Sequence, residues 1–206
     1  MKSHQLSALV ATMSVATANA APPPDAPLLS GRSIAAPPVE HIELDTLKIV
    51  LEETTLGEIA KSIGAGKISH QEDAGESQYW LCYADADFSV WLISGGEMGG
   101  SEHAVTRVVA RRTSPASDCT TAARKPLQLS INGESWLSRS MSKVAHVLGR
   151  PSATRGLWTL YSYEGRSGAV DAAKCQPDGF DLSNWLAIES RNGTVTEIQL
   201  GQISSC

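Results

Sequence analysis

One segment of this chain returns in similar form later in the same chain. The segment that begins at Thr55 (TLGEIAKSIG) is matched by the segment that begins at Ser140 (SMSKVAHVLG), with apolar residues at the same spacing. In both copies three predicted strands follow, at residues 78–83, 87–93 and 104–111, and at residues 156–163, 184–190 and 194–200. This repetition constrains the fold more than any single residue does, because it predicts two similar units built from the same elements.

Both matched segments carry the signals of a short helix. Thr55 and Glu58 have the spacing of a capping box, and Ser140 occupies the corresponding position in the second copy. Apolar residues then recur at helical spacing until a glycine, Gly64 or Gly149, which is typical of a helix end. We therefore expect one helix at the start of each unit.

These elements predict an α+β fold of two tandem repeats. Each repeat would have one or two helices packed on one face of a three- or four-stranded antiparallel sheet, with the two sheets forming a joint open face. The predicted division is a signal peptide at 1–20, an Ala/Pro-rich disordered arm at 21–40 (the N-terminal arm), repeat 1 at 41–112, a linker at 113–125 and repeat 2 at 126–206.

Alternation along the strands assigns side chains to the two faces. Aligned positions predict that the helices are faced by Trp80, Cys82, Val90, Leu92, Thr106 and Val108, and by Trp158, Leu160, Asn184, Leu186, Thr196 and Ile198. The opposite parity is aromatic and polar, as is typical of a surface that meets a partner. The predicted partner-binding residues are Tyr79, Tyr83, Trp91, Arg107, Tyr161, Tyr163, Trp185 and Glu197.

The N-terminus predicts export. A short basic start and a mildly apolar run lead to Ala18-Asn19-Ala20, a small-x-small pattern that predicts cleavage after Ala20 and a periplasmic or secreted protein. The run is too short to span a bilayer. The formal net charge is −5 and no basic run is present, which argues against nucleic acid or an anionic membrane as the partner.

Four cysteines in an exported chain predict two disulfides. Three pairings are possible. A duplicated fold favours one bridge within each half, Cys82–Cys119 and Cys175–Cys206. The spacing matches no zinc or redox motif, so we expect no metal at these thiols.

The remaining motifs predict no catalytic residues and no cofactor. The glycine-rich residues 95–100 precede a predicted strand, whereas a phosphate loop precedes a helix. Ser140 and Lys143 have the S-x-x-K spacing of some acylating enzymes, but the position of Ser140 favours a helix cap. The histidines are scattered, and acidic neighbours of His41 or His70 offer at most a minor cation site.

Each half thus combines a helix ending in Gly-x-Gly or Gly-x-Pro, an aromatic strand, a Trp-containing strand and a closing Val-x-x-Val or Val-x-x-Ile strand. With one disulfide per half, this resembles the tandem-repeat β-lactamase inhibitor proteins over about residues 43–201. Each unit is similar to the small outer-membrane lipoproteins of the SmpA/BamE type, although the lipid-anchor cysteine is missing. The resemblance implies a concave sheet face that clamps a partner protein.

Three classes of function follow. The first is an exported protein-binding module, an inhibitor or immunity-type protein that holds its protein partner with an aromatic sheet face. The alternative is an envelope structural or assembly factor. The third class, an enzyme, is disfavoured because neither copy contains a catalytic cluster.

Overall fold

The computed structural model describes residues 20–71, 77–96, 100, 102–112, 118–121, 127–167 and 180–205. This part of the chain is mostly β and contains two eight-residue helices, α1 (Leu56–Ile63) and α2 (Met141–Leu148). The strands are β1 (Ile42–Leu44), β2 (Leu47–Ile49), β3 (Ser69–Gln71), β4 (Gln78–Ala84), β5 (Ser89–Gly95), β6 (Arg107–Arg111), β7 (Thr120–Thr121), β8 (Leu129–Ile131), β9 (Ala153–Arg155), β10 (Trp158–Ser167), β11 (Phe180–Arg191) and β12 (Thr194–Ser205).

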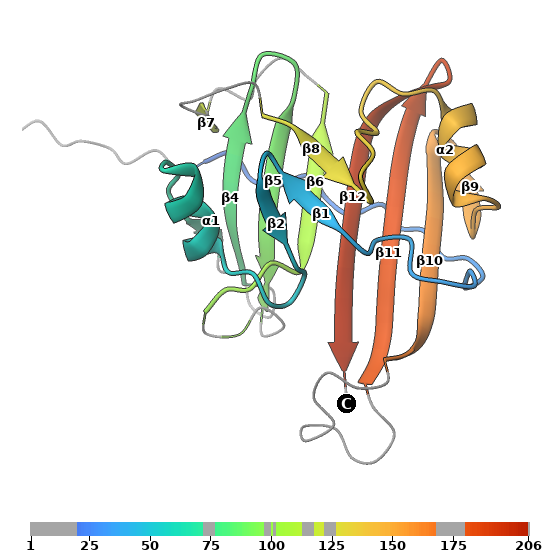
Figure 1. Cartoon of the computed structure of the whole chain (residues 1–206), viewed down its shortest axis with the longest axis horizontal. Helices are drawn as coiled ribbons and strands as arrows, with labels where there is room; N and C mark the ends of the chain where they lie inside the picture. Colours follow the sequence, from blue (N-terminus) through green and yellow to red (C-terminus); the bar gives the residue numbers. More distant parts are fainter. Residues whose placement is uncertain are drawn as a thin grey trace, which may run out of the picture.

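A single large sheet of nine strands dominates the molecule (Figure 1). Its order is β3-β4-β5-β6-β12-β11-β10-β9, all antiparallel, and β7 adds to β4 in parallel. At the centre β6 pairs with β12, so that Arg107 lies opposite Gly201 and Arg111 lies opposite Glu197.

This central pairing overturns the predicted fold class. The expected α+β fold of two tandem repeats, each with its own three- or four-stranded sheet under a helix, is wrong. As free edges, β6 and β12 would each present a row of unpaired backbone N–H and C=O groups. Pairing the two strands satisfies both rows and merges the strands into one sheet.

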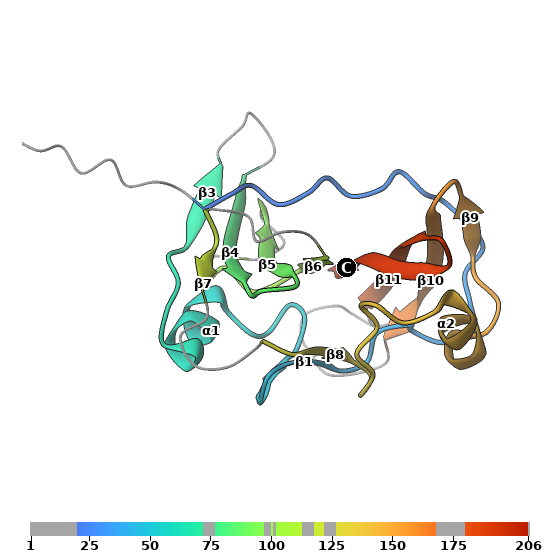
Figure 2. The same cartoon turned by 90° about the horizontal axis from the view of Figure 1, so that it is seen from above.

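A second, three-stranded sheet lies over one face of the large one, between the two helices (Figure 2). Its order is β2-β1-β8, with Ile42 opposite both Ile49 and Ile131. We call the side of the large sheet that carries the two helices and the small sheet the helix face. The main core lies there and includes Ile42, Leu56, Ile59, Leu92, Ile131, Val144 and Leu186.

The two helices begin and end where the sequence predicts. The Thr55 side chain accepts a hydrogen bond from the Glu58 backbone N–H, and the Glu58 carboxylate accepts one from the Thr55 N–H, which completes the capping box. α1 ends at Gly64, whose φ of 74° is left-handed. Ser140 caps α2 by accepting from the Lys143 N–H, without the reciprocal half of a capping box, and Gly149 ends this helix.

The strand faces follow the prediction for four long strands and contradict it for two. Along β5, β6, β11 and β12 the expected core residues Val90, Leu92, Val108, Leu186 and Ile198 join the main core. Thr196 is an exception, because a register shift in β12 places Val195 in the core and the Thr196 hydroxyl donates to Glu189 Oε2. Along β4 and β10 the faces are inverted. Leu81, Tyr83 and Tyr161 lie in the main core, whereas Trp80, Cys82 and Leu160 lie on the other side.

The wrong assignment of the faces of β4 has a physical cause. β4 reads QYWLCYA, and its last five residues are all buried, because both faces of the sheet are covered at this strand. A strand that is buried on both sides reads as a continuous apolar run, so alternation does not identify its faces.

The opposite side of the large sheet, which we call the far face, is crossed by the N-terminal arm. Figure 2 shows this segment, in blue, running from the β3 end of the sheet to the β9 end. At the β10 edge the Ile34 N–H donates to the Ser162 carbonyl at 2.8 Å, and the chain then passes to the helix face. There Asn184 accepts from the Val39 N–H and donates to the Val39 carbonyl. The arm therefore wraps one end of the sheet.

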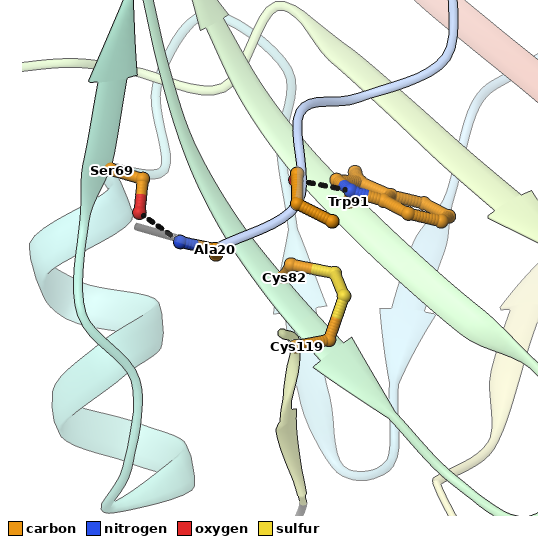
Figure 3. Close-up of a disulfide and its surroundings, with 6 residues drawn as sticks. Ala20, Ser69, Cys82, Trp91 and Cys119 are labelled. Atoms are coloured by element: carbon orange, nitrogen blue, oxygen red, sulfur yellow. Dashed lines mark hydrogen bonds between the residues drawn. A yellow bond between two sulfur atoms is a disulfide. The ribbon is translucent and has the colours of Figure 1, made fainter. Parts of the chain in front are cut away.

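The predicted Cys82–Cys119 disulfide is confirmed. It joins β4 to the residue before β7, with a Cα–Cα distance of 4.9 Å and a sequence separation of 37 residues. Figure 3 shows the bridge on the far face beside Trp91 and the start of the arm. The other predicted pair, Cys175 and Cys206, lies outside the described residues.

Candidate binding face

The far face is the candidate site because it combines aromatic, apolar and charged side chains beneath one extended segment, the N-terminal arm. Strand pairing places them in rows across the sheet, since opposed residues share a face. The residues that define it are Trp80, Cys82, Trp91, Ile93, Arg107, Val109, Arg111, Leu160, Trp185, Glu197, Gln199 and Ile203.

One end of the far face is a compact apolar cluster. Trp80, Cys82, Trp91, Ile93 and Val109 are buried together, and Ala20 and Cys119 pack against them. Trp91 is 4% exposed, so its ring is part of the structure there. The Trp91 indole Nε1 donates to the Ala21 carbonyl at 3.0 Å, and the Ala20 N–H donates to Ser69 Oγ at 2.9 Å (Figure 3). These bonds fix the start of the arm.

The middle of the far face is polar and lies over the β6–β12 junction. Arg107 Nη2 makes a long hydrogen bond of 3.5 Å to the Pro24 carbonyl, and Gln199 Nε2 donates to the Asp25 carbonyl at 2.9 Å. Gln199 Nε2 also donates to Glu197 Oε1 at 2.7 Å. Burial lowers the pKa of the Arg107 guanidinium, and the nearby Asp25 carboxylate opposes that shift. The arm therefore supplies Arg107 with a countercharge as well as an acceptor.

The other end of the far face is more open and centres on Trp185. Gly201 lies opposite Trp185, and a Cβ atom at Gly201 would come within 2.9 Å of the Trp185 ring. The glycine thus lets the indole lie flat across β12. A pocket of about 370 Å³ separates the arm from the sheet here and is lined by Leu29, Leu160 and Trp185 among others.

A smaller hollow, of about 230 Å³, also borders Trp185. Ile93, Arg107 and Ile203 line it, and Ile203 is 46% exposed. The indole therefore stands between two hollows on a face where the arm covers the sheet incompletely. An accessible tryptophan beside apolar hollows is the arrangement in which aromatic side chains anchor partners.

Three buried polar atoms on the far face have no hydrogen-bond partner among the described residues. They are Trp80 Nε1, Arg107 Nε and Gln199 Oε1. The orientation of the Gln199 amide is fixed, because its nitrogen donates to two acceptors, and its oxygen is consequently the unpaired atom. Buried polar atoms in native structures are almost always paired, so this face has a hydrogen-bonding capacity that the arm does not use.

The structure divides the eight predicted site residues between the two faces. Trp91, Arg107, Trp185 and Glu197 lie on the far face, as their strands predict. The four tyrosines, Tyr79, Tyr83, Tyr161 and Tyr163, lie on the helix face.

The four tyrosines are buried or half-buried in, or stacked on, other parts of the fold. The Tyr83 hydroxyl donates to the Ala65 carbonyl at 2.8 Å, and burial raises the pKa of Tyr83 to about 12. Burial also raises the pKa of Tyr161. Tyr79 stacks on His103, with ring centroids 3.8 Å apart, and on His70. Tyr163 lies opposite Asn184 and is half-buried.

Sequence reasoning missed Gln199, Leu160 and Ile203 as far-face residues. Gln199 has the same parity as Glu197 on β12, and the alternation of these two polar residues with Ile198 and Leu200 was the available signal. Leu160 was missed because the faces of β10 were inverted. Ile203 lies beyond the predicted end of the strand, which continues to Ser205.

The weaker motifs have local explanations. Ser140 Oγ accepts from the Lys143 N–H as a helix cap, and Lys143 Nζ pairs with Glu134 Oε2 at 2.7 Å. Within the described ranges, no group of three or more His, Cys, Asp or Glu residues is placed to hold a metal ion. None of the helices found there is long and apolar enough to cross a membrane. Part of the glycine-rich loop, residues 97–99, lies outside the described residues.

Comparisons of the chain with protein-family models, with curated proteins and with solved structures found no match.

Proposed function

We propose that this chain is a protein-binding module and that the far face is its binding surface. The observation that carries the proposal is the arm itself. An extended segment of polypeptide already lies on this face, held by side chains of the sheet at Trp91, Arg107 and Gln199. A surface that holds one extended chain has the chemistry to hold another.

Three further features support a binding role. Trp185 stands between two hollows, and the large aromatic surface of tryptophan makes it a frequent anchor at interfaces. Leu28, at 91% exposed, and Ile203, at 46% exposed, add apolar surface at the arm and at the end of β12. Unpaired polar atoms beneath the arm leave hydrogen bonds for a partner to make.

The proposal is compatible with the exported inhibitor or immunity-type protein that the sequence suggests. An envelope assembly factor would use the same face, and the identity of the partner separates these two roles. Both readings predict that binding depends on the open end of the far face, around Trp185.

The test is capture of partners from envelope extract by the immobilised full chain, read by quantitative mass spectrometry. Trp185→Ala should reduce the recovery of a true partner at least about tenfold, since an anchor residue is worth more than about 1.4 kcal/mol. Leu157→Ala is the matched control, because Leu157 is 48% exposed and lies in the turn before β10. A partner that binds the Trp185→Ala protein as well as the native chain would place the binding surface elsewhere.

A further inference from the structure

We infer that the far face is a site for an extended proline-rich peptide followed by an acidic residue, and that residues 21–27 of the chain are its internal ligand. This inference rests on the proposed function, because it names the ligand chemistry of the same face. The residues that recognise the peptide are Trp91, Arg107 and Gln199.

The direction of the hydrogen bonds carries the inference. All three bonds run from a side-chain donor on the sheet to a backbone carbonyl of the arm, at Ala21, Pro24 and Asp25. Proline has no backbone N–H, so a proline run presents carbonyl acceptors and no donors. A face that supplies an indole N–H, a guanidinium and an amide N–H is the complement of such a run.

The sequence of the internal ligand is suited to this contact. Residues 21–27 read APPPDAP, and consecutive prolines favour the extended polyproline conformation before binding. Such a segment loses little conformational entropy when it is held. After the prolines, the nearby Asp25 carboxylate favours the charged form of Arg107, so an acidic residue just beyond the run suits this face.

The arm leaves part of the site unused. Gln199 Oε1 is a buried acceptor that no described residue bonds, although the amide nitrogen of Gln199 holds the arm. Arg107 Nε and Trp80 Nε1 are unpaired donors on the same face. A second peptide with one N–H near Gln199 would make a bond that this stretch of the arm does not. Such a bond, from an N–H beside the proline run, would favour exchange of the arm for that peptide.

The alternative is that the arm is a permanent part of the fold. In that case the three contacts stabilise the sheet, and no separate peptide competes for them. The two possibilities differ in a measurable way, because only a replaceable ligand can be exchanged for the same peptide added in solution.

The probe is a synthetic peptide with the sequence of residues 21–30, and its control replaces the three consecutive prolines, residues 22–24, by alanine. The protein is the full oxidised chain in two forms, the native sequence and a variant with Pro22→Gly, Pro23→Gly and Pro24→Gly. The glycines loosen the arm because they widen the conformational space of the detached segment. A tethered native arm competes at an effective concentration on the order of millimolar, so it masks the site.

We expect the peptide to bind the loosened variant at least about tenfold more tightly than the native chain. The alanine peptide should bind at least about tenfold more weakly than the proline peptide. In the loosened variant, Trp91→Phe keeps an aromatic ring and removes the N–H, and should weaken binding about fivefold or more. Val147→Ala, on an exposed position of α2, should leave binding unchanged.

A second measurement keeps the test decisive if a variant is unstable. The NMR signal of the Trp91 indole N–H should shift when the arm is loosened and return toward its native position when the peptide is added. Equal affinity for the proline and alanine peptides, no exchange into the loosened variant, or an indole signal that the peptide does not move would each overturn the inference. If the peptide test fails in one of these ways while partner capture still depends on Trp185, the proposed function stands and the far face binds a different kind of ligand.

Discussion

Arg111 and Glu197 face each other across the β6–β12 junction, with Arg111 Nε 2.5 Å from Glu197 Oε2. The Glu197 side chain is 4% exposed and that of Arg111 is 38% exposed, so a nearly buried carboxylate is balanced by a cation that still reaches solvent. Gln199 Nε2 donates to the other oxygen of the same carboxylate. This pair lies at the strand pairing that joins the two parts of the sheet.

Removing only the cation should therefore be more harmful than removing both charges. Arg111→Met leaves the Glu197 carboxylate without its ion pair and should lower the free energy of unfolding by about 1–3 kcal/mol, less than for a fully buried pair because Arg111 is partly exposed. Adding Glu197→Gln should restore part of that loss. Urea denaturation of the native protein, both single variants and the double variant measures the coupling. Additive losses would mean that the two side chains do not interact.

The two tryptophans at opposite ends of the far face should respond differently to truncation. Trp91 is 4% exposed within the apolar cluster, so Trp91→Ala should cost about 3–5 kcal/mol of stability. Trp80→Ala should cost as much, since Trp80 is 3% exposed in the same cluster. Trp185 is only partly buried beside two hollows, and Trp185→Ala should cost about 1–2 kcal/mol.

Thermal and denaturant unfolding of these variants provides the measurement. The inverted faces of β4 matter here, because the predicted parity would make Trp80 a core residue under the helices and Trp91 a dispensable surface residue. A Trp91→Ala protein that is as stable as the native chain would contradict the packing of the apolar cluster.

Stability should fall at alkaline pH because of Tyr83. Burial raises the pKa of Tyr83 to about 12 in the folded chain, whereas tyrosine in an unfolded chain titrates near 10. Between about pH 10 and pH 12 the unfolded state has released a proton that the folded state retains, so the free energy of unfolding decreases as the pH rises.

Tyr83→Phe should remove about 1–2 kcal/mol of this pH-dependent loss, and Tyr163→Phe, at a half-exposed position, is the control. Urea denaturation at a series of pH values from about 9 to about 12, a window that brackets the two titrations, gives the slope. A slope that is identical in the native and Tyr83→Phe proteins would show that this hydroxyl titrates alike in both states. Tyr161, whose pKa is also raised, should leave a residual slope in the Tyr83→Phe protein.

The Cys82–Cys119 bridge closes a long loop and should contribute about 3–4 kcal/mol in the chain-entropy model. The variant with Cys82→Ser and Cys119→Ser should unfold at a correspondingly lower denaturant concentration under oxidising conditions. Reduction of that variant is the informative control. A further loss of stability would report a second bridge between Cys175 and Cys206, and no further loss would argue against the predicted pair.

The parts of the fold that the sequence predicted are those with local signals. Thr55 and Glu58 determine the start of α1 through a capping box, and Gly64 ends it through a left-handed φ, so both boundaries are visible within ten residues. The faces of β5 and β11 were correct because Trp91 and Trp185 alternate with smaller apolar residues. β4 has aromatic or apolar residues at neighbouring positions on both faces, and its parity had no local signal.

The non-local features were missed for a different reason. The pairing of β6 with β12 joins residues that are far apart in the sequence, and nothing in either strand identifies the other as its partner. Four of the eight predicted site residues, Trp91, Arg107, Trp185 and Glu197, lie on the far face because they are on strands whose parity was clear. The contribution of the arm was missed because a proline-rich segment has neither a strand nor a helix pattern that places it on a sheet.

The path of the arm around the β10 edge also determines how far it can be lifted. β9 pairs with β10 only at Trp158–Leu160. Beyond that point the Ser162 carbonyl accepts from the Ile34 N–H, the Ser162 N–H donates to Ser152 Oγ, and Ser33 Oγ bonds both the N–H and the carbonyl of Glu164. A ligand that replaced only residues 21–27 would leave these hydrogen bonds of Ser33 and Ile34 to β10 in place. Detaching residues 33 and 34 as well would free the N–H and carbonyl of Glu164 at this edge, and free edge groups can pair with the same strand of another molecule. As long as residues 33 and 34 stay bonded to β10, a ligand can therefore exchange with residues 21–27 without causing the protein to self-associate.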